Sequence, residues 1–506
     1  MGVGLLMLAT GSRESNFITK NPEITFFKTV YKRHTNFSVE TVPQYFINPI
    51  DFGRQTTLNV SKHGDLVNDI YLYLQLPPLV SNNDSYSNYK ISYVKNLGYA
   101  LIKKVEVEIG GIVLSREYGE WMYIWNELMT PVGQKRGVNM MLGNTEEFTK
   151  PEKSKESVSL TIPLYFWFNR GTCNSLPLVS LSKDEVKIHI ELRRLSEVVI
   201  QTPQRFVKIT SDFCSLKDGD IFYQMINGKK QIGVFYDFDL TKNMLYYNPL
   251  VGTIKYVDNS VNNILYTESG ESYQISSDLN NYGKVGDYFN LNYPSLINGY
   301  CLINYVFLDN EERYLYLTRN HEYLVQVSEN VTEETFNSSN IKYNLHFVHP
   351  VTSLYFRVML EQNITNKDYF EFSKYPLVEK DIFSNNGYVG SELVKTESLL
   401  KSVKMYINGQ QLSNIDEPKF YNYLQNMKYF GGKGNEFIYK YSFGINPLDD
   451  NQPNGSINFS KIDDAYLQLN LDGDVNYQNP VRVRAYAINY NIFRIINGIG
   501  NFVFSI

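Results

Sequence analysis

Short segments in which apolar and polar residues alternate run through most of the chain. Tyr, Phe, Val and Ile recur at every second position of these segments, and clusters of Asn, Gly, Asp and Pro separate one segment from the next. Alternation with a period of two is typical of strands that bury one face, whereas patterns with a helical period are few and short. The sequence therefore predicts an all-β chain with a few short helices.

The period changes within residues 21–46, near the N-terminus. Asn21 is a predicted N-cap, with proline and glutamate after it and apolar residues at helical spacing, namely Ile24, Phe27, Val30 and Tyr31. From Thr35 the pattern alternates, and one face is formed by Phe37, Val39 and Thr41. We therefore expect a short helix that leads directly into a half-buried strand.

Residues 101–129 align with residues 399–427 without a gap, and nine of the 29 aligned pairs are identical, where chance would give roughly two. Each copy predicts a strand, a tight turn at Gly110-Gly111 or Asn408-Gly409, a short second strand and an amphipathic helix. The apolar faces predicted for the two helices are formed by Tyr118, Trp121, Met122, Trp125 and Leu128 in the first copy and by Phe420, Tyr423, Leu424 and Met427 in the second.

The segments around this block repeat in the same order. Residues 65–77 correspond to residues 349–361, and residues 163–192 correspond to residues 441–471. Duplicated strands must each bury one face against a second sheet, so the duplication predicts two tandem sandwich domains. A jelly roll, which closes sheet edges that a simple meander leaves open, is the expected form of each sandwich.

The predicted division of the chain is an N-terminal arm at residues 1–20, a first jelly roll at residues 21–325 and a second jelly roll at residues 326–506. Residues 201–297 contain alternating segments and turn signals but have no counterpart in the second half. We interpret them as a large β-rich insertion in the first jelly roll, and hypothesise that the insertion projects from the outer surface.

A short connecting unit is predicted between the two halves. A strand from Ile303 to Leu308 ends at Asp309, a predicted N-cap, and Glu312 stands at the capping-box position of the helix that follows. A glycine-rich loop at residues 430–436 is expected to cap one end of the second sandwich.

Several segments resemble the major capsid proteins of nucleocytoplasmic large DNA viruses. The N-terminal PEITFFKTVYKRHTNF is similar to that family's opening signature, and PLYFWFNRGTCNSLPLVSLSKDEVKIHIELR resembles its first-domain signature. The segments HPVTSLYF, QPNGSINFSKID and RAYAINYNIFRIINGIGNFVFS resemble second-domain and terminal signatures. The resemblance spans the chain apart from residues 201–297, and it implies a double jelly roll.

The resemblance also implies a structural function. The expected assembly is a homotrimeric capsomer of pseudo-hexagonal outline that tiles the icosahedral shell of a large double-stranded DNA virus. The implied partners are neighbouring capsomers and minor capsid and penton proteins, with internal membrane-associated virion proteins as further candidates. The implied location is the virion shell, assembled in the host cytoplasm. The runner-up is a carbohydrate-binding jelly-roll protein, such as a virion fibre or lectin, and a glycoside hydrolase on the same scaffold is a third alternative.

Charge, cysteine spacing and the apolar N-terminus argue against nucleic-acid binding, a zinc site, a disulfide framework and a membrane span. The net charge is −5 without a run of five like charges, so we expect no direct contact with nucleic acid. Cys173, Cys214 and Cys301 are too widely spaced to suggest a zinc site or a disulfide framework. The apolar residues 3–9 are too short to span a bilayer and follow no basic region. We expect them to form an extended arm that packs on a neighbour or frays.

Candidate chemical groups are few, and we expect no catalytic, cofactor-binding or metal-binding residues and no enzyme. His346 and His349 lie in a segment that looks extended, so their rings would face opposite ways. Residues 431–434 (GGKG) lack the spacing of a phosphate loop. The remaining candidates are two acidic pairs, which fall at matching places in the two copies, and two tryptophans at helical spacing. The acidic pairs are Asp184 with Glu185 and Asp463 with Asp464, and a turn or strand start explains them better than a pair of glycosidase carboxylates. The tryptophans are Trp121 and Trp125, and a place in the core or at a subunit interface explains them better than a sugar-binding platform.

Overall fold

The computed structural model of the chain describes most of its 506 residues. The residues outside the description are 1, 10–16, 81–88, 227, 258–261, 268, 278–281, 286–293, 375–378, 385–386, 394–397, 413–414, 431–436, 474, 478 and 505–506. The predicted loop at residues 430–436 and the GGKG segment within it therefore lie, apart from Phe430, outside the described residues.

Two sheets form a first sandwich, which we call the first roll. One sheet has the order β1-β20-β3-β10, with β9 also paired to β3, and the other has the order β2-β11-β6-β7. The strands are β1 (Phe37–Gln44), β2 (Gln55–Asn59), β3 (Leu66–Leu76), β6 (Ile102–Ile109), β7 (Ile112–Tyr118), β9 (Val158–Pro163), β10 (Leu176–Pro177), β11 (Val186–Leu192) and β20 (Asn298–Leu308).

A second sandwich, the second roll, repeats this order. Its larger sheet is β21-β32-β24-β29, with β22 and β33 paired to β32 and β30 paired to β24, and its smaller sheet is β23-β31-β27-β28. The strands are β21 (His321–Asn330), β22 (Glu334–Phe336), β23 (Asn340–Asn344), β24 (Pro350–Leu360), β27 (Leu400–Ile407), β28 (Gln410–Gln411), β29 (Tyr439–Ser442), β30 (Ile457–Asn458), β31 (Ala465–Leu471), β32 (Val481–Ile496) and β33 (Ile499–Phe502).

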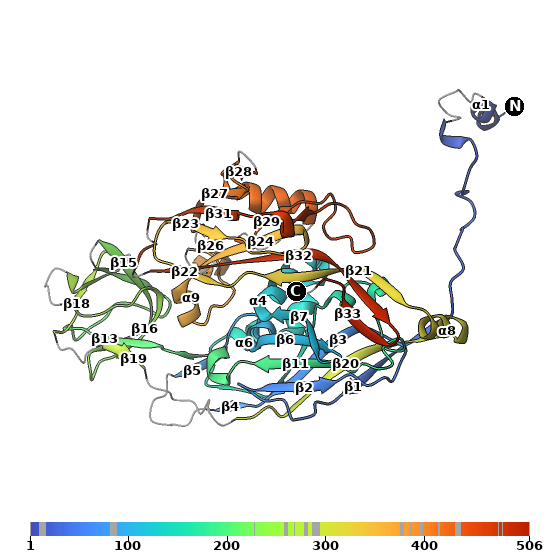
Figure 1. Cartoon of the computed structure of the whole chain (residues 1–506). Coiled ribbons are helices and arrows are strands. Elements are labelled where there is room, and N and C mark those ends of the chain that lie inside the picture. Colours follow the sequence, from blue (N-terminus) through green and yellow to red (C-terminus); the bar gives the residue numbers. More distant parts are fainter. Residues whose placement is uncertain are drawn as a thin grey trace.

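The two rolls match strand for strand. Four strands form the main path of each sheet, so each roll has eight main strands. Numbered along the chain within a roll, strands 1, 8, 3 and 6 form one sheet, and strands 2, 7, 4 and 5 form the other. This is the order of a jelly roll, in which Greek-key connections join two packed sheets. The predicted duplication is confirmed, since β3 and β24 come from the aligned flanks and β6 and β27 from the aligned block. Figure 1 shows the two rolls stacked, with the second above the first.

The aligned acidic pairs mark the same place in both rolls. The Gly110 N–H donates to the carbonyl of Glu185 at 3.1 Å, and the Asn408 N–H donates to the carbonyl of Asp464 at 2.7 Å. Each pair directly precedes a central strand, β11 or β31. Asp184 and Glu185 and their counterparts Asp463 and Asp464 therefore stand at equivalent strand starts in the two rolls.

Helices occupy the connections. Those of the first roll are α3 (Leu97–Leu101), α4 (Gly119–Met129), α5 (Lys135–Met141), α6 (Glu146–Thr149) and α7 (Leu195–Val198), with single turns η1 (Val132–Gln134), η2 (Trp167–Asn169) and η3 (Thr172–Asn174). In the second roll the connections contain α9 (Glu361–Thr365), η7 (Phe459–Lys461) and a helix at residues 418–430. This second-roll helix consists mainly of two π-helical parts, η5 (Phe420–Leu424) and η6 (Asn426–Phe430).

The insertion between β11 and β20 is a separate β-structure, as predicted. Its sheet has the order β18-β17-β14-β15-β16-β13-β19 and its own apolar cluster, which includes Phe222, Leu245 and Tyr247. Figure 1 shows it at the end of the molecule opposite α8. Its strands are β13 (Arg205–Lys208), β14 (Ile221–Ile226), β15 (Lys229–Asp239), β16 (Met244–Val251), β17 (Ile264–Thr267), β18 (Ser272–Gln274) and β19 (Tyr282–Lys284).

Three short pairs complete the sheets. They are β5 (Lys90–Tyr93) with β12 (Val199–Thr202), β4 (Leu79–Val80) with β8 (Ser154–Lys155), and β25 (Glu379–Ser384) with β26 (Gly387–Leu393). The connecting helix between the rolls is α8 (Asn310–Thr318), and the Asp309 carboxylate accepts the Glu312 N–H at 2.9 Å, so the predicted N-cap is confirmed.

Three predictions for the N-terminal region are wrong, namely the helix from Asn21, the extended arm and the half-buried strand. Residues 21–36 contain no helix, and Asn21 has a φ of 55° instead of the extended conformation of an N-cap. Residues 3–9 are not extended but form the helix α1 (Val3–Ala9), which buries none of its side chains. The predicted strand is present as β1, yet Phe37 and Val39 are more than half exposed, so it is not half-buried in the single chain.

Candidate assembly surfaces

The helix α4 joins the two rolls within one chain. Trp121 is only 1% exposed. The centre of its ring lies 5.3 Å from that of Tyr355 on β24 and 5.1 Å from that of Tyr486 on β32. Two residues further along α4, the ring of Tyr123 stacks on that of Phe370 at 4.4 Å. Aromatic side chains contribute most of the energy of such interfaces because each removes a large apolar area from water. Trp121 is therefore part of an internal interface and offers no platform for a sugar.

A buried ionic network lies beside these rings. The Arg357 guanidinium, fully buried on β24, donates to both carboxylate oxygens of Glu120 on α4 at 2.8 and 2.7 Å, and also pairs with Glu333. Burial alone would raise the pKa of Glu120, but Arg357 lowers it below its ordinary value. Arg482 extends the network to Glu333 and Glu361. No sequence motif signals this network, because Glu120 and Arg357 are 237 positions apart.

A second buried carboxyl group lies in the contact between the two rolls, which we call the joint. It has no basic partner within hydrogen-bonding distance among the described residues. Glu117, at the end of β7, is buried, and the Ser328 hydroxyl on β21 lies 2.7 Å from both of its carboxylate oxygens. Burial raises the pKa of Glu117 to about 7, against the lowering effects of the Ser328 and Ser115 hydroxyls and of Arg170. The contact between the rolls therefore buries a carboxyl group whose pKa lies above its ordinary value.

The outer face of β24 is covered, whereas that of its counterpart β3 is open. Along β24 nine consecutive residues from Val351 to Met359 are buried. Along β3 from Ile70 onward, buried residues alternate with half-exposed ones. The half-exposed residues include Tyr71 and Tyr73, which align with Tyr355 and Arg357 of the second roll.

Further aromatic residues enlarge this open face of the first roll. The Tyr73 ring stacks on Tyr300 of β20 at 4.6 Å, and Tyr300 in turn lies 5.7 Å from the exposed ring of Tyr45. We call this surface, formed by Tyr45, Tyr71, Tyr73 and Tyr300, the tyrosine face.

The second-roll helix is the counterpart of α4, but its predicted apolar face is exposed. Tyr423 is 51% exposed and Met427 is 79% exposed, and Leu424 beside them is also exposed, whereas the aligned Trp125 of α4 is buried at 3%. The side chains that it buries are instead Tyr421, Asn422, Gln425 and Phe430. The predicted face is therefore wrong for the single chain. The π-helical turns, which are wider than α-helical turns, change the spacing at which side chains share a face. In Figure 1 this helix lies on the side of the second roll away from the first.

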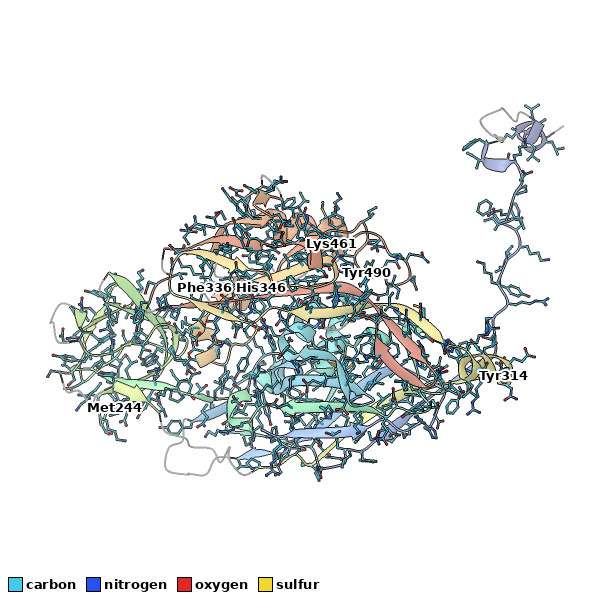
Figure 2. The ribbon with its side chains drawn as sticks, in the orientation of Figure 1. Met244, Tyr314, Phe336, His346, Lys461 and Tyr490 are labelled. Carbon is cyan, nitrogen blue, oxygen red and sulfur yellow. The ribbon has the colours of Figure 1, made fainter. Side chains whose placement is uncertain are left out.

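The described parts of the N-terminal segment, residues 2–9 and 17–36, form a further exposed apolar surface. This segment leaves the body near α8 and carries large side chains that contact little of the chain, including Phe17, Phe26 and Phe27, each more than nine-tenths exposed (Figure 1). Figure 2 shows Tyr314, also exposed, on α8 at the same end of the molecule. Monomeric soluble proteins rarely leave such large apolar areas in water, so this end of the chain has the character of an interaction surface.

The described residues form no other recognisable site. His346 is exposed and His349 is buried, and no group of three or more His, Cys, Asp or Glu side chains in the described ranges could hold a metal ion. Cys173, Cys214 and Cys301 are free thiols. Among the helices of the described part, none has the length and apolar character that a membrane span requires.

Comparisons with known proteins agree with the fold. A family model described as "Major capsid protein N-terminus" matches residues 25–234, and one described as "Large eukaryotic DNA virus major capsid protein" matches residues 312–501. The chain is 32% identical to "Probable capsid protein 4" of Acanthamoeba polyphaga mimivirus, covering 100% of this chain and 99% of that protein. It is 28% identical to the major capsid protein of Phaeocystis pouchetii virus, with full coverage of both.

Solved structures show the same architecture. VP54 of PBCV-1, fitted into a reconstruction of the virophage Sputnik, superposes with a TM-score of 0.63 at 21% identity, covering 95% of this chain and all of VP54. The Faustovirus major capsid protein gives a TM-score of 0.66 at 12% identity, with coverage of 96% and 94%. These neighbours are double jelly rolls, so the predicted fold is confirmed. By its full-length similarity and its two matching family models, the chain belongs to the major capsid proteins of large eukaryotic DNA viruses.

Proposed function

We propose that three copies of this chain form a ring of six jelly rolls, and that this pseudo-hexagonal homotrimer is the capsomer of an icosahedral viral shell. The observation that carries the proposal is the contrast between α4, whose apolar face is covered by the second roll, and the second-roll helix, whose corresponding face is open. Within one chain, only the first of these two similar contacts is made.

The missing contact has a natural partner in another copy. The first roll places α4 on the outer face of β24, and β24 aligns with β3. The same contact between copies would place the second-roll helix on the tyrosine face of the next first roll. A heterologous contact of this kind closes into a ring when the rotation per roll is about 60°. In a closed ring of three chains with two rolls each, every tyrosine face is then covered by the second-roll helix of a neighbouring chain.

The N-terminal segment supplies a second contact between copies. Residues 2–36 contain five basic and two acidic residues, a net charge of +3, so the remainder of the chain carries −8 to give the total of −5. A basic and apolar segment is therefore complementary to the acidic body of a neighbouring copy.

The finer assignments follow from this function. The capsomers contact one another and minor capsid and penton proteins, with internal membrane-associated virion proteins as further partners, and the shell assembles in the host cytoplasm. We propose no direct contact with nucleic acid and no catalytic role. The division into an arm at residues 1–20 and rolls at 21–325 and 326–506 is likewise kept as a proposal. The change of sheet at α8 supports two rolls, with the boundary before β21 (His321–Asn330), which already belongs to the second roll.

Light scattering with paired variants tests the trimer. The unaltered protein is expected at three times the chain mass, and the double variant Leu424→Asp, Met427→Asp at the mass of one chain with an unchanged circular dichroism spectrum. Leu240→Asp, at an exposed apolar position of the insertion, is the control and keeps the trimer. A trimer that survives both aspartates, or an unaltered protein that stays monomeric at high concentration, contradicts the proposal.

A further inference from the structure

A cavity separates the insertion from the second roll. Its volume is about 790 Å³, within the usual range of small-molecule pockets. One wall comes from β14, β15 and the end of β16, and the other from α9 and the connection between β31 and β32. The insertion and this connection join equivalent strands of the two rolls, so the cavity lies where the corresponding connections meet.

Hydrogen bonds fix the two walls to each other at the base of the cavity. The Gly252 N–H donates to the side-chain carbonyl of Gln362 at 2.6 Å, and the Gln362 amide nitrogen lies 3.3 Å from the carbonyls of Leu250 and Gly252. The Asn366 side chain donates to the carbonyl of Pro249 at 3.2 Å. Both amides come from α9 or its end, so the two walls are already held in position without a ligand.

The described lining is strongly basic in an acidic protein. Four basic side chains and one acidic side chain, Glu361, line the cavity, a net charge of +3, whereas the whole chain carries −5. Both oxygens of Glu361 are taken by Arg482, which lowers the pKa of Glu361 and keeps it ionised but neutralised. The basic residues are Arg205, Lys230, Lys255 and Lys374.

The three basic side chains that the insertion contributes lack counter-charges among the described residues. Arg205, Lys230 and Lys255 form no ion pair with a described carboxylate. Lys374, on the side of the second roll, lies 3.3 Å from Asp472. Like charges gathered around one hollow repel one another, and a multiply charged anion relieves that repulsion more than separate monovalent ions.

We propose that this cavity binds a compact polyphosphate group, which bridges the insertion and the second roll. Arg205 offers the planar guanidinium that matches phosphate oxygens, and the lysines act as point charges around it. Arg205, Lys230 and Lys255 belong to the insertion and Lys374 to the second roll, so the bound anion fixes the insertion against the body of its own chain. This inference goes beyond the shell-building function and does not depend on the trimer.

Calorimetric titration of the full-length protein with sodium tripolyphosphate tests the site. We expect saturable binding with one site per chain that weakens as salt rises, since the contacts are largely ionic. A parallel titration with ATP distinguishes the source of the phosphates. Equal or tighter binding of ATP assigns the phosphate chain of a nucleotide, and weaker binding assigns free polyphosphate. Binding of neither overturns the proposal.

Matched variants separate the site from general surface charge. Arg205→Gln with Lys255→Gln is expected to weaken tripolyphosphate binding at least tenfold, and Arg205→Lys to retain most of it. Lys103→Gln with Lys342→Gln, at exposed positions of the two rolls, changes the net charge equally and leaves binding unchanged. Bound tripolyphosphate should also slow proteolysis within the insertion. Equal losses in both double variants, with the thermal unfolding profiles unaltered, mean that the anion binds the surface at large, and the proposal fails.

Discussion

The outer faces of β3 and β24 have the same origin and different surroundings. On β24 the second roll carries Tyr355 and a buried arginine, and α4 covers both. On β3 the aligned positions are tyrosines left half-exposed. The duplicated unit therefore has one donor helix and one acceptor face in each roll, and a single chain satisfies only one such pair. The unsatisfied pair indicates where the next copy belongs.

The largest loss of stability is expected from a change on the covered outer face of β24. Arg357→Ala removes the buried cation between Glu120 and Glu333 and leaves their carboxylates without compensation, which costs about 3–5 kcal/mol. The urea midpoint at fixed protein concentration measures it. Arg494→Ala, which breaks an exposed pair with Glu322, should cost no more than about 1 kcal/mol. Equal midpoints for the two variants would refute the importance assigned to the buried network.

A truncation of aligned aromatic residues compares the two helices directly. Trp125→Ala creates a cavity under α4 and should destabilise the chain by about 3–5 kcal/mol. Tyr423→Ala, at the aligned position of the second-roll helix, should change the unfolding midpoint by less than about 1 kcal/mol under dissociating conditions. If Tyr423→Ala destabilises the isolated chain as much as Trp125→Ala, the helix is not an open surface.

The joint between the rolls should also respond to pH. Because the folded pKa of Glu117, about 7, exceeds its ordinary value of 4.5, the folded protein binds this proton more tightly than the unfolded chain. The stabilisation from Glu117 is complete below pH 4.5 and is lost as pH rises through 7, a change on the order of 3 kcal/mol. Glu117→Gln should therefore be more stable than the parent at pH 8 and nearly equal to it at pH 5.

Thermal unfolding of the two proteins across this range checks the difference. Glu185→Gln, an exposed carboxyl at the start of β11, is the control and should leave the pH profile of the parent unchanged. A parent profile that does not differ in slope from that of Glu117→Gln would show that this carboxyl ionises normally in the folded chain.

The smallest effect on folding is expected from the exposed N-terminus. Deletion of residues 2–36 removes side chains that, in the described parts 2–9 and 17–36, bury almost nothing in the single chain, so the free energy of unfolding should stay within about 0.5 kcal/mol of that of the full chain. Sedimentation should nevertheless show weaker association between copies. Unchanged association at all concentrations would exclude a contact with a neighbouring copy.

The sequence predicted the elements that repeat. Residues 101–129 and 399–427 show one pattern twice, and the strands, turns and helix starts follow from local periodicity and turn residues. The helix predicted from Asn21 failed because a short helix that packs on nothing gains too little to offset nucleation. The face of the second-roll helix failed because an apolar stripe does not tell whether its own chain or another one covers it.

The buried ion pairs between the two rolls could not be predicted from the sequence. Glu120 and Arg357 meet only after both rolls have folded, and neither stands in a motif. The basic cavity was hidden for the same reason, because Arg205, Lys255 and Lys374 come from strands and loops more than a hundred positions apart at the extremes. Long-range pairing of charges follows from topology, which local patterns do not specify.

Cross-linking between copies tests the central claim most directly. In a chain with Cys173 and Cys214 replaced by serine, Lys419→Cys on the second-roll helix and Tyr71→Cys on β3 reproduce the aligned positions of Trp121 and Tyr355, whose rings lie 5.3 Å apart. The account predicts that a short bismaleimide links chains carrying both cysteines into covalent trimers, and links a mixture of the two single variants into dimers. Chains that stay single after complete modification of both thiols would contradict it.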